Sequence, residues 1–218
     1  LAENERIGEN LIFNELFLER SFITFILLLI LYLFIRYGLK DSPKRAKVLA
    51  VSATAIILNL ILSRLVLELG SLIFQNSEAL FALLPNLLPI ALAPILTAVL
   101  VGALPGILSA LVISILFCLG FDNSLEQCLI TFLPGIVGVY AAHNTRSRSK
   151  LLRAGLLTGL VSAFGYATVS LLNENSIAFI TQQIFASIGV GLITAVIVVG
   201  LLSAFEQLFQ ITTSITLL

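Results

Sequence analysis

Charged residues are scarce in this sequence, and methionine is absent. Lys, Arg, Asp and Glu make up 11% of the 218 residues, whereas about a quarter is usual in soluble domains. With 59% hydrophobic residues and a mean hydropathy of +1.10, this composition excludes a soluble domain and predicts an integral membrane protein. The net charge is zero, so the basic footprint of a nucleic-acid-binding protein is absent. Because the chain begins at Leu1 and contains no Met, we expect a fragment, a processed form or an edited form of a protein.

Residues that commonly bind metals or catalyse reactions are also few. Cys118 and Cys128 are the only cysteines and flank a short loop, which leaves open either a disulfide in an oxidising compartment or two free thiols. His143 is the only histidine, and neither a cysteine nor an acidic residue lies close to it in the sequence. We therefore predict neither a metal nor a cofactor site in this chain, and no catalytic group of residues is recognisable.

What the sequence does contain is a series of long apolar stretches. They predict an all-α fold, a polytopic membrane helical bundle with about seven transmembrane helices. The expected spans are residues 22–37, 48–70, 84–102, 107–120, 128–142, 154–172 and 184–207. In domain terms, residues 21–208 form the membrane domain and residues 209–218 a cytoplasmic connector. Residues 1–20 are acidic and partly apolar, which fits a surface helix, an extracytoplasmic linker or the tail of an outer domain.

The third expected span, residues 84–102, is unusual because it contains three prolines. Pro85, Pro89 and Pro94 each remove a backbone donor and press against the preceding turn, which predicts a kinked central helix. Carbonyl oxygens freed in this way need partners inside a membrane, and we expect neighbouring helices, Asn86, Thr97 or trapped water to supply them. A tight turn is expected after this span at Leu104-Pro105-Gly106.

Small residues recur at intervals of four in the last two expected spans. Gly155 and Gly159 lie four residues apart in one span, and Ser187, Gly191 and Ala195 follow the same spacing in the next. This spacing allows two helix backbones to approach closely in a membrane. We therefore predict tight packing between the sixth and seventh spans.

Positive charges predict the orientation in the membrane. Nine of the twelve lie on one side of the expected topology, in two basic loops and beside them: Arg36, Lys40, Lys44, Arg45, Lys47, Arg146, Arg148, Lys150 and Arg153. By the positive-inside rule that side is cytoplasmic, so the N-terminus is expected outside the cell and the C-terminus inside. The same cations either bind anionic lipid head groups or only set the topology.

Arg64 is the most expensive residue to place in a bilayer, at about 2.5–3.5 kcal/mol near the centre of a span. One hypothesis is an outward-facing pocket in which Asn59, Arg64, Glu68 and Asn86 bind a polar ligand. The alternative is structural, because Arg64 lies six residues before Gly70. Its side chain can then extend to the interface and pair with Glu68 one turn away.

Three stretches resemble the membrane domain of a known bacterial receptor family. They are residues 205–218, the segment from Leu88-Pro89 to Ala93-Pro94-Ile95-Leu96, and the stretch Arg148-Ser149-Lys150-Leu151-Leu152-Arg153-Ala154-Gly155. In these stretches the chain is similar to bacterial seven-transmembrane receptors with an intracellular HD hydrolase. The resemblance covers most of the chain as a pattern, and its most specific part is the C-terminal segment.

The resemblance implies a sensory and anchoring module in the bacterial inner membrane, which relays an outside signal to a cyclic di-AMP phosphodiesterase. Family members carry an extracytoplasmic domain before these helices and an HD hydrolase domain, with its divalent metals, after them. The implied partners are the lipid bilayer and those two domains, with a homodimer left open and no nucleic acid. Two other functions stay open: a vitamin-type solute-binding membrane subunit of an importer, and an enzyme acting within the membrane.

Overall fold

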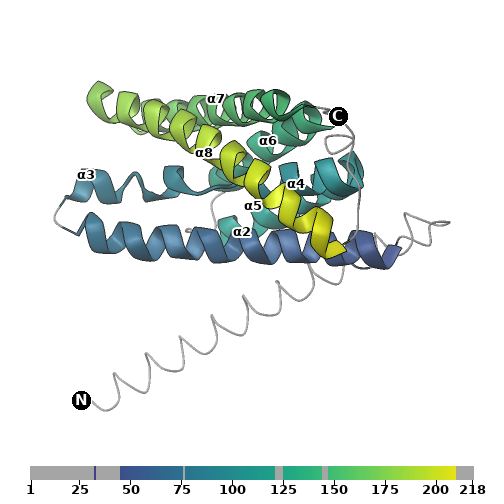
Figure 1. The fold of residues 1–218 in the computed structure, drawn as a ribbon. Helices are drawn as coiled ribbons and strands as arrows, with labels where there is room; N and C mark the ends of the chain where they lie inside the picture. Colours follow the sequence, from purple (N-terminus) through teal and green to yellow (C-terminus); the bar gives the residue numbers. More distant parts are fainter. Residues whose placement is uncertain (1–31, 33–44, 76, 121–124, 144–146, 210–218) are drawn as a thin grey trace, which may run out of the picture. The chain divides into compact units, whose positions relative to one another are not determined.

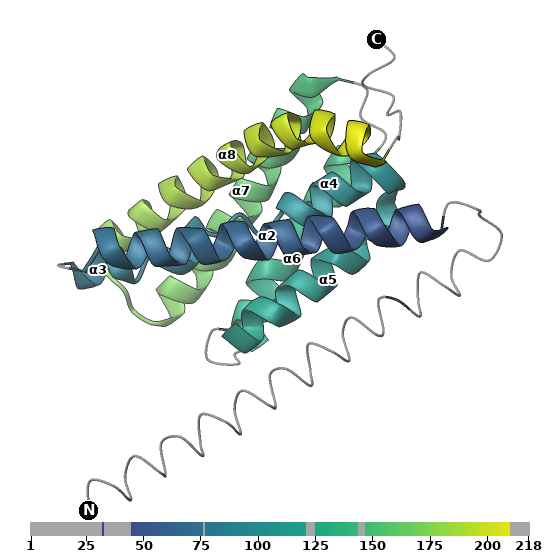
Figure 2. The same ribbon diagram turned by 60° about the horizontal axis from the view of Figure 1, so that its bottom comes forward.

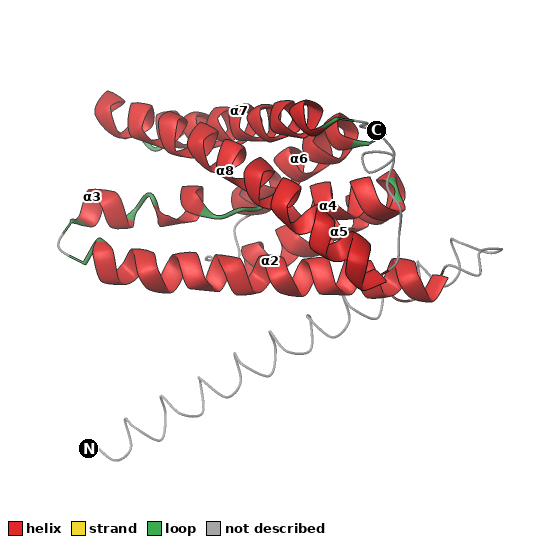
Figure 3. Ribbon diagram, viewed as in Figure 1, coloured by secondary structure: helices red, strands yellow, loops and turns green. Residues whose placement is uncertain are grey.

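The computed structural model describes residue 32 and residues 45–75, 77–120, 125–143 and 147–209. Within these ranges the chain forms helices joined by short loops, without any strand (Figure 3). The elements are α2 (Arg45–Ile73), α3 (Glu78–Phe81), the 3₁₀ helix η1 (Leu84–Leu87), α4 (Leu92–Val101), α5 (Ala103–Gly120), α6 (Leu125–Ala142), α7 (Arg148–Leu172) and α8 (Ile177–Phe209).

Six described segments are long and apolar enough to cross a membrane, which confirms the predicted all-α membrane bundle. One of the six combines η1 and α4. The first expected span, residues 22–37, lies outside the described residues apart from residue 32, which is helical. Residues 1–20 and 210–218, predicted to be an outer linker and a cytoplasmic connector, also lie outside them.

Helix α4 lies in the middle of the bundle formed from residue 43 onward. It contacts α2, α5, α6 and α8, and Figures 1 and 2 show these longer helices around it. Its side chains are almost all buried, with Leu92, Ile95 and Leu96 fully so. On the outer helices, large apolar side chains such as Phe164 and Ile193 are exposed instead, as expected where lipid surrounds a protein.

The proline-rich span differs from the predicted kinked helix because it is interrupted. Residues 84–87 form one 3₁₀ turn, Leu88 is extended with φ −77° and ψ 133°, and α4 begins only at Leu92. Pro89 explains the break, since its ring disfavours helical geometry at the residue before it. Pro94 lies in the first turn of α4, where its missing N–H is not needed by the helix.

The predicted tight turn at Leu104-Pro105-Gly106 is wrong. The chain turns at Gly102, whose φ of 116° and ψ of 170° are accessible mainly to glycine. Pro105 lies in the first turn of α5, a place where helices tolerate proline. Gly106 instead serves packing, because a Cβ there would lie 2.9 Å from Val139 Cγ2 and 3.1 Å from the carbonyl oxygen of Pro94.

Helices α7 and α8 begin six and seven residues earlier than predicted, at Arg148 and Ile177. With 33 residues, α8 is about 50 Å long at 1.5 Å per residue, well beyond the hydrocarbon thickness of about 30 Å. The prediction located each helix from its most apolar stretch. Helices continue past that stretch because Arg, Lys and Gln are good helix formers outside the hydrocarbon as well.

Candidate functional site

The break in the central span leaves backbone carbonyls that neighbouring helices satisfy. Asn59 on α2 donates from Nδ2 to the Pro89 carbonyl oxygen at 2.9 Å. Tyr166 on α7 donates its hydroxyl to the Pro85 carbonyl oxygen at 3.1 Å and accepts from Gln127 Nε2 at 3.2 Å. The expectation that neighbouring helices provide these partners is confirmed. The interrupted span is thus held on two sides, by α2 and by α7.

Thr97 and Asn86, also named as partners for the freed carbonyls, have other roles. The Thr97 hydroxyl lies 2.5 Å from the Ala93 carbonyl oxygen in the preceding turn of its own helix. It is also 3.3 Å from Ser109 Oγ on α5. Asn86 is buried in η1, and no described residue offers its Nδ2 a hydrogen-bond partner.

The hypothesised pocket of Asn59, Arg64, Glu68 and Asn86 is divided by the structure. Arg64 and Glu68 form an ion pair at 2.7 Å, with 76% and 59% of their side chains exposed. Asn59 is fully buried and faces Pro89. Asn86 lines a separate cavity together with residues of α7 and α8. Ligand binding by these four residues stays a prediction, and the pairing expected from the structural alternative is present.

The tight packing predicted from the sequence between α7 and α8 is confirmed. A Cβ at Gly159 would lie 2.9 Å from both the Ile188 Cα and the Ser187 carbonyl oxygen. A Cβ at Gly191 would lie 2.7 Å from the Gly159 backbone, and one at Gly155 would strike Ala195 and Gly191. We call this contact, formed by Gly155, Gly159, Ser187, Gly191 and Ala195, the α7–α8 seam. No side chain fits between the two backbones there.

A small polar cavity adjoins the α7–α8 seam where η1 meets it. Its volume is about 20 Å³, close to the space that one water molecule needs. The lining residues come from the interrupted span, α7 and α8: Asn86, Leu88, Ile90, Ala91, Thr158, Gly159, Ser162, Ser187, Val190, Gly191 and Thr194. Among them, Ser187 Oγ is a second buried polar atom without a partner in the described part of the chain.

A larger hollow of about 550 Å³ opens where α7 ends and α8 begins. Two of the residues that line it are hydrogen-bonded to each other, since Ser170 donates to Gln183 Oε1 at 2.5 Å. Uncharged groups surround it: Ala82, Tyr166, Val169, Ser170, Asn173, Asn175, Ser176, Phe179 and Gln183. It is a wide-open hollow in the surface and not an enclosed cavity.

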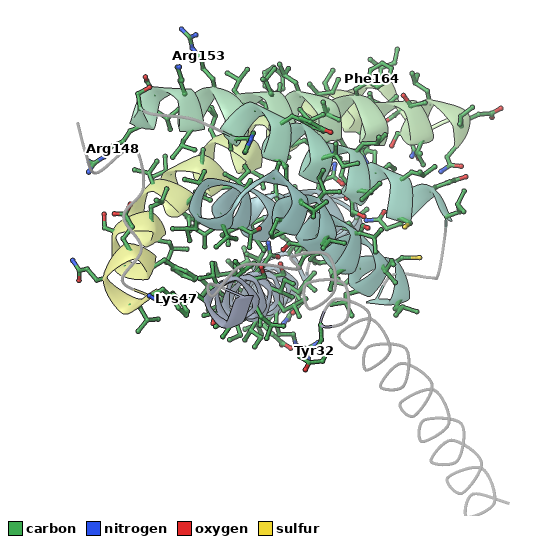
Figure 4. All side chains as sticks on the ribbon, turned by 90° about the vertical axis from the view of Figure 1, so that its right-hand side faces the viewer. Tyr32, Lys47, Arg148, Arg153 and Phe164 are labelled. Carbon is green, nitrogen blue, oxygen red and sulfur yellow. The ribbon has the colours of Figure 1, made fainter. Side chains whose placement is uncertain are left out.

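Basic side chains gather at the other end of the bundle. Lys47 lies in the first turn of α2, and Arg148, Lys150 and Arg153 lie in the first two turns of α7. Figure 4 looks onto this end and labels Lys47, Arg148 and Arg153. We call it the cationic end; α8 also finishes there (Figure 1).

The structure places several residues of the predicted basic loops in helices instead. Arg45, Lys47, Arg148 and Lys150 belong to α2 and α7, since both helices extend beyond their apolar stretches. Lys44 and Arg146 lie outside the described residues.

The two cysteines lie at the far end of the α5–α6 pair from the cationic end. Neither cysteine forms a disulfide in the structure, and both side chains are half-buried. Among the described residues, no group of three or more His, Cys, Asp and Glu side chains could hold a metal ion.

Sequence reasoning missed the polar residues that connect the helices, namely Gln127, Tyr166, Ser170 and Gln183. Each pairs with a residue at least 13 positions away along the chain. The available signal was their polarity inside otherwise apolar spans, because such groups require partners in a membrane. Their identity as partners depends on the bundle geometry, which a single helix does not reveal.

A family model described as 7TM receptor with intracellular HD hydrolase matches residues 16–213 of this chain. The matched region includes all six described spans and reaches past the end of α8. Neither a curated protein nor a solved structure gives a significant match.

Proposed function

This chain belongs to the family of 7TM receptors with an intracellular HD hydrolase, and on that premise we propose that it relays an outside signal to a cyclic di-AMP hydrolase. The match over residues 16–213 supports the link between a membrane receptor and an intracellular HD hydrolase. The relay and the cyclic di-AMP substrate are our proposal, based on the family resemblance given above. The chain is then the sensory and anchoring module. Hydrolysis would be carried out by the HD domain, which would also bind the divalent metals.

The proposed orientation puts the cationic end in the cytoplasm. Lys47, Arg148, Lys150 and Arg153 support it, since positively charged residues are retained on the cytoplasmic side of a bacterial membrane. Helix α8 finishes at this end and would lead toward the HD domain. The opposite end, with the 550 Å³ hollow, would face an extracytoplasmic domain that receives the signal.

The proposed relay acts through the α7–α8 seam. Backbones in direct contact have few intermediate positions, so a shift of α7 has to move α8 or separate the two helices. Helix α8 is long enough to connect both membrane surfaces by itself. A displacement at the hollow would thus reach the cytoplasmic side along one continuous helix.

The substrate assignment is tested with the full-length protein in membranes, supplied with Mn²⁺. We expect hydrolysis of cyclic di-AMP, faster than that of cyclic di-GMP. A full-length protein that binds the metal but cleaves no cyclic dinucleotide would contradict the substrate assignment.

The relay is tested by comparing Gly191→Ala with Gly200→Ala in the same full-length protein. The first substitution strikes the Gly159 backbone, whereas a Cβ at Gly200 meets nothing within 4 Å. We expect Gly191→Ala to change the hydrolysis rate several-fold and Gly200→Ala to leave it unchanged. Equal rates in both well-folded variants would rule out a relay through the seam.

The orientation is tested in a variant in which Cys118 and Cys128 are replaced by Ser. A cysteine introduced at Glu174, exposed between α7 and α8, should react with a membrane-impermeant maleimide in intact cells. A cysteine at Lys150, exposed at the cationic end, should react only after lysis. The reverse pattern would invert the proposed topology.

The 550 Å³ hollow favours a second candidate, a vitamin-type solute-binding membrane subunit of an importer. Its Asn, Ser and Gln side chains suit a neutral, hydrogen-bonding solute. Water-soluble vitamins can be screened by their effect on the Tm of the purified chain. A stabilising vitamin whose effect is lost in Asn175→Leu would support this candidate, and a flat response across the panel would count against it.

A further inference from the structure

We propose that the cavity between η1 and the α7–α8 seam binds one water molecule, which joins Asn86 to Ser187 by hydrogen bonds. This inference requires only the packing of described residues and does not depend on the proposed function. Its tests therefore measure stability and water occupancy instead of hydrolysis.

Two unpartnered polar atoms line the same cavity. Asn86 is 4% exposed and Ser187 is 2% exposed, and neither Asn86 Nδ2 nor Ser187 Oγ has a protein partner among the described residues. Such groups lose free energy when they are buried without hydrogen bonds. One is a donor, and the other is a hydroxyl that can donate or accept. A water molecule accepts from the amide and bonds to the hydroxyl at once.

The size and lining of the cavity match a single water. A buried water needs roughly 10–15 Å³ and between two and four polar partners, and this cavity has about 20 Å³. Further oxygens come from Thr158, Ser162 and Thr194, which also line it. Thr158 already donates to the Gly155 carbonyl oxygen at 2.8 Å, so its hydroxyl oxygen remains able to accept.

The same chemistry disfavours other occupants. No acidic side chain lines the cavity, and a bare cation buried away from carboxylates loses far more hydration than neutral oxygens restore. An organic solute is too large for a volume of about 20 Å³. Neutral donors and acceptors in a water-sized space therefore select water.

The bound water would connect the break in the central span to α8. Asn86 belongs to η1, which ends directly before the extended Leu88. Ser187 belongs to the α7–α8 seam. A water-mediated bond can be almost as favourable in enthalpy as a direct one. It also adjusts more readily to small shifts between the two elements, because the water is free to reorient.

A double-mutant cycle on the purified chain tests the shared water. We expect Asn86→Ala and Ser187→Ala each to lower the Tm by a few degrees. The double variant should lose clearly less than the sum, because either substitution alone already breaks the water-mediated bridge. Additive losses would overturn the proposal. If Asn86→Ala folds poorly and the cycle cannot be completed, Ser187→Ala, which removes only one oxygen, still tests the water through the ordered-water peak described below.

Ser52 provides a matched control for the cycle. Its Oγ is the third buried, unpartnered side-chain atom found in the described residues, but it lies on α2 and does not line this cavity. Ser52→Ala combined with Asn86→Ala should give additive losses. Non-additivity of the same size in this pair would show a global effect and would count against a shared water.

Two direct measurements complete the test. An experimental structure fine enough to show ordered water should contain a peak within hydrogen-bond distance of Asn86 Nδ2 and Ser187 Oγ, and that peak should vanish in Ser187→Ala. The Tm should also be unchanged when choline replaces sodium. A dry cavity, or stabilisation by sodium alone, would refute the assignment.

Discussion

The interrupted span and α8 are embedded in the bundle in opposite ways. In the interrupted span, Leu84–Val101, 78% of the residues are buried, against 28% in the most apolar 18-residue stretch of α8. The first is held by side chains packed on all sides, together with the bonds from Asn59 and Tyr166. The second packs most closely along one stripe, where its backbone touches α7, and it also contacts η1, α4 and α2. Burial therefore identifies the structural centre, whereas backbone contact identifies α7 as the neighbour against which α8 packs most closely.

The largest loss of stability is expected from shortening a buried side chain in the interrupted span. Leu92→Ala removes a fully buried side chain and should lower the free energy of unfolding by about 2–5 kcal/mol, because a cavity remains. Ile193→Ala on α8, 59% exposed, should change it by no more than about 0.5 kcal/mol. Reversible unfolding in mixed detergent measures both. Similar losses of unfolding free energy in the two variants would contradict the distinction between a buried interrupted span and a peripheral α8.

A smaller but more specific effect is expected at the α7–α8 seam. Gly159→Ala places a methyl group against the Ile188 backbone at 2.9 Å and should cost about 1–3 kcal/mol through overpacking. Gly189→Ala is the matched control, since nothing lies within 4 Å of its Cβ, and alanine favours the helix. The same unfolding experiment should show destabilisation only at Gly159. A stabilised Gly159→Ala variant would mean that the seam is looser than described.

These two regions also differ in how far the sequence predicts them. The seam could be predicted because Gly155 and Gly159 are spaced by four, and that spacing alone brings small residues onto one helix face. The interrupted span was predicted only in part. Proline at 85, 89 and 94 indicates a disturbance, but a kink and a break differ in whether neighbours can satisfy the freed carbonyls. Those neighbours, Asn59 and Tyr166, are 30 and 81 residues away from their acceptors.

The candidate site shows the same limit. Asn59 is close in sequence to the Arg64–Glu68 pair but leaves α2 in a different direction, because five residues at about 100° each rotate Arg64 by roughly 140° from Asn59. Glu68, one turn after Arg64, stays on the same side as Arg64. Asn59 consequently faces the core, and the ion pair faces outward. Ser187 lines the same cavity as Asn86 but follows it about a hundred residues later, and no local pattern connects the two.

The bond from Asn59 to Pro89 should contribute less than either packing term. Asn59→Ala removes the side-chain donor to the Pro89 carbonyl oxygen, which keeps only the Leu92 N–H at 3.2 Å. Hydrogen bonds between membrane helices are worth about 0.6–2 kcal/mol. Ser63→Ala is the control, because the Ser63 hydroxyl is 3.4 Å from Asn59 Oδ1 and makes a weak bond at best. The free energy of unfolding should be lower for Asn59→Ala than for Ser63→Ala. If both are neutral, α2 is held by apolar contacts alone.

The smallest effect is expected at Arg64, although a membrane arginine is usually a sign of function. Both members of its pair with Glu68 are mostly exposed, and such helical pairs are worth about 0.3–0.5 kcal/mol. Arg64→Leu should therefore leave unfolding nearly unchanged, and Arg64→Lys should match it. The informative measurement is then the hydrolysis rate of the full-length protein. If Arg64→Leu is stable and unaltered in rate, the pair only lets a charged helix segment reach the membrane surface. If the rate changes in Arg64→Leu and recovers in Arg64→Lys, the exposed face of α2 takes part in receiving the signal, and the periphery has a second functional helix beside α8.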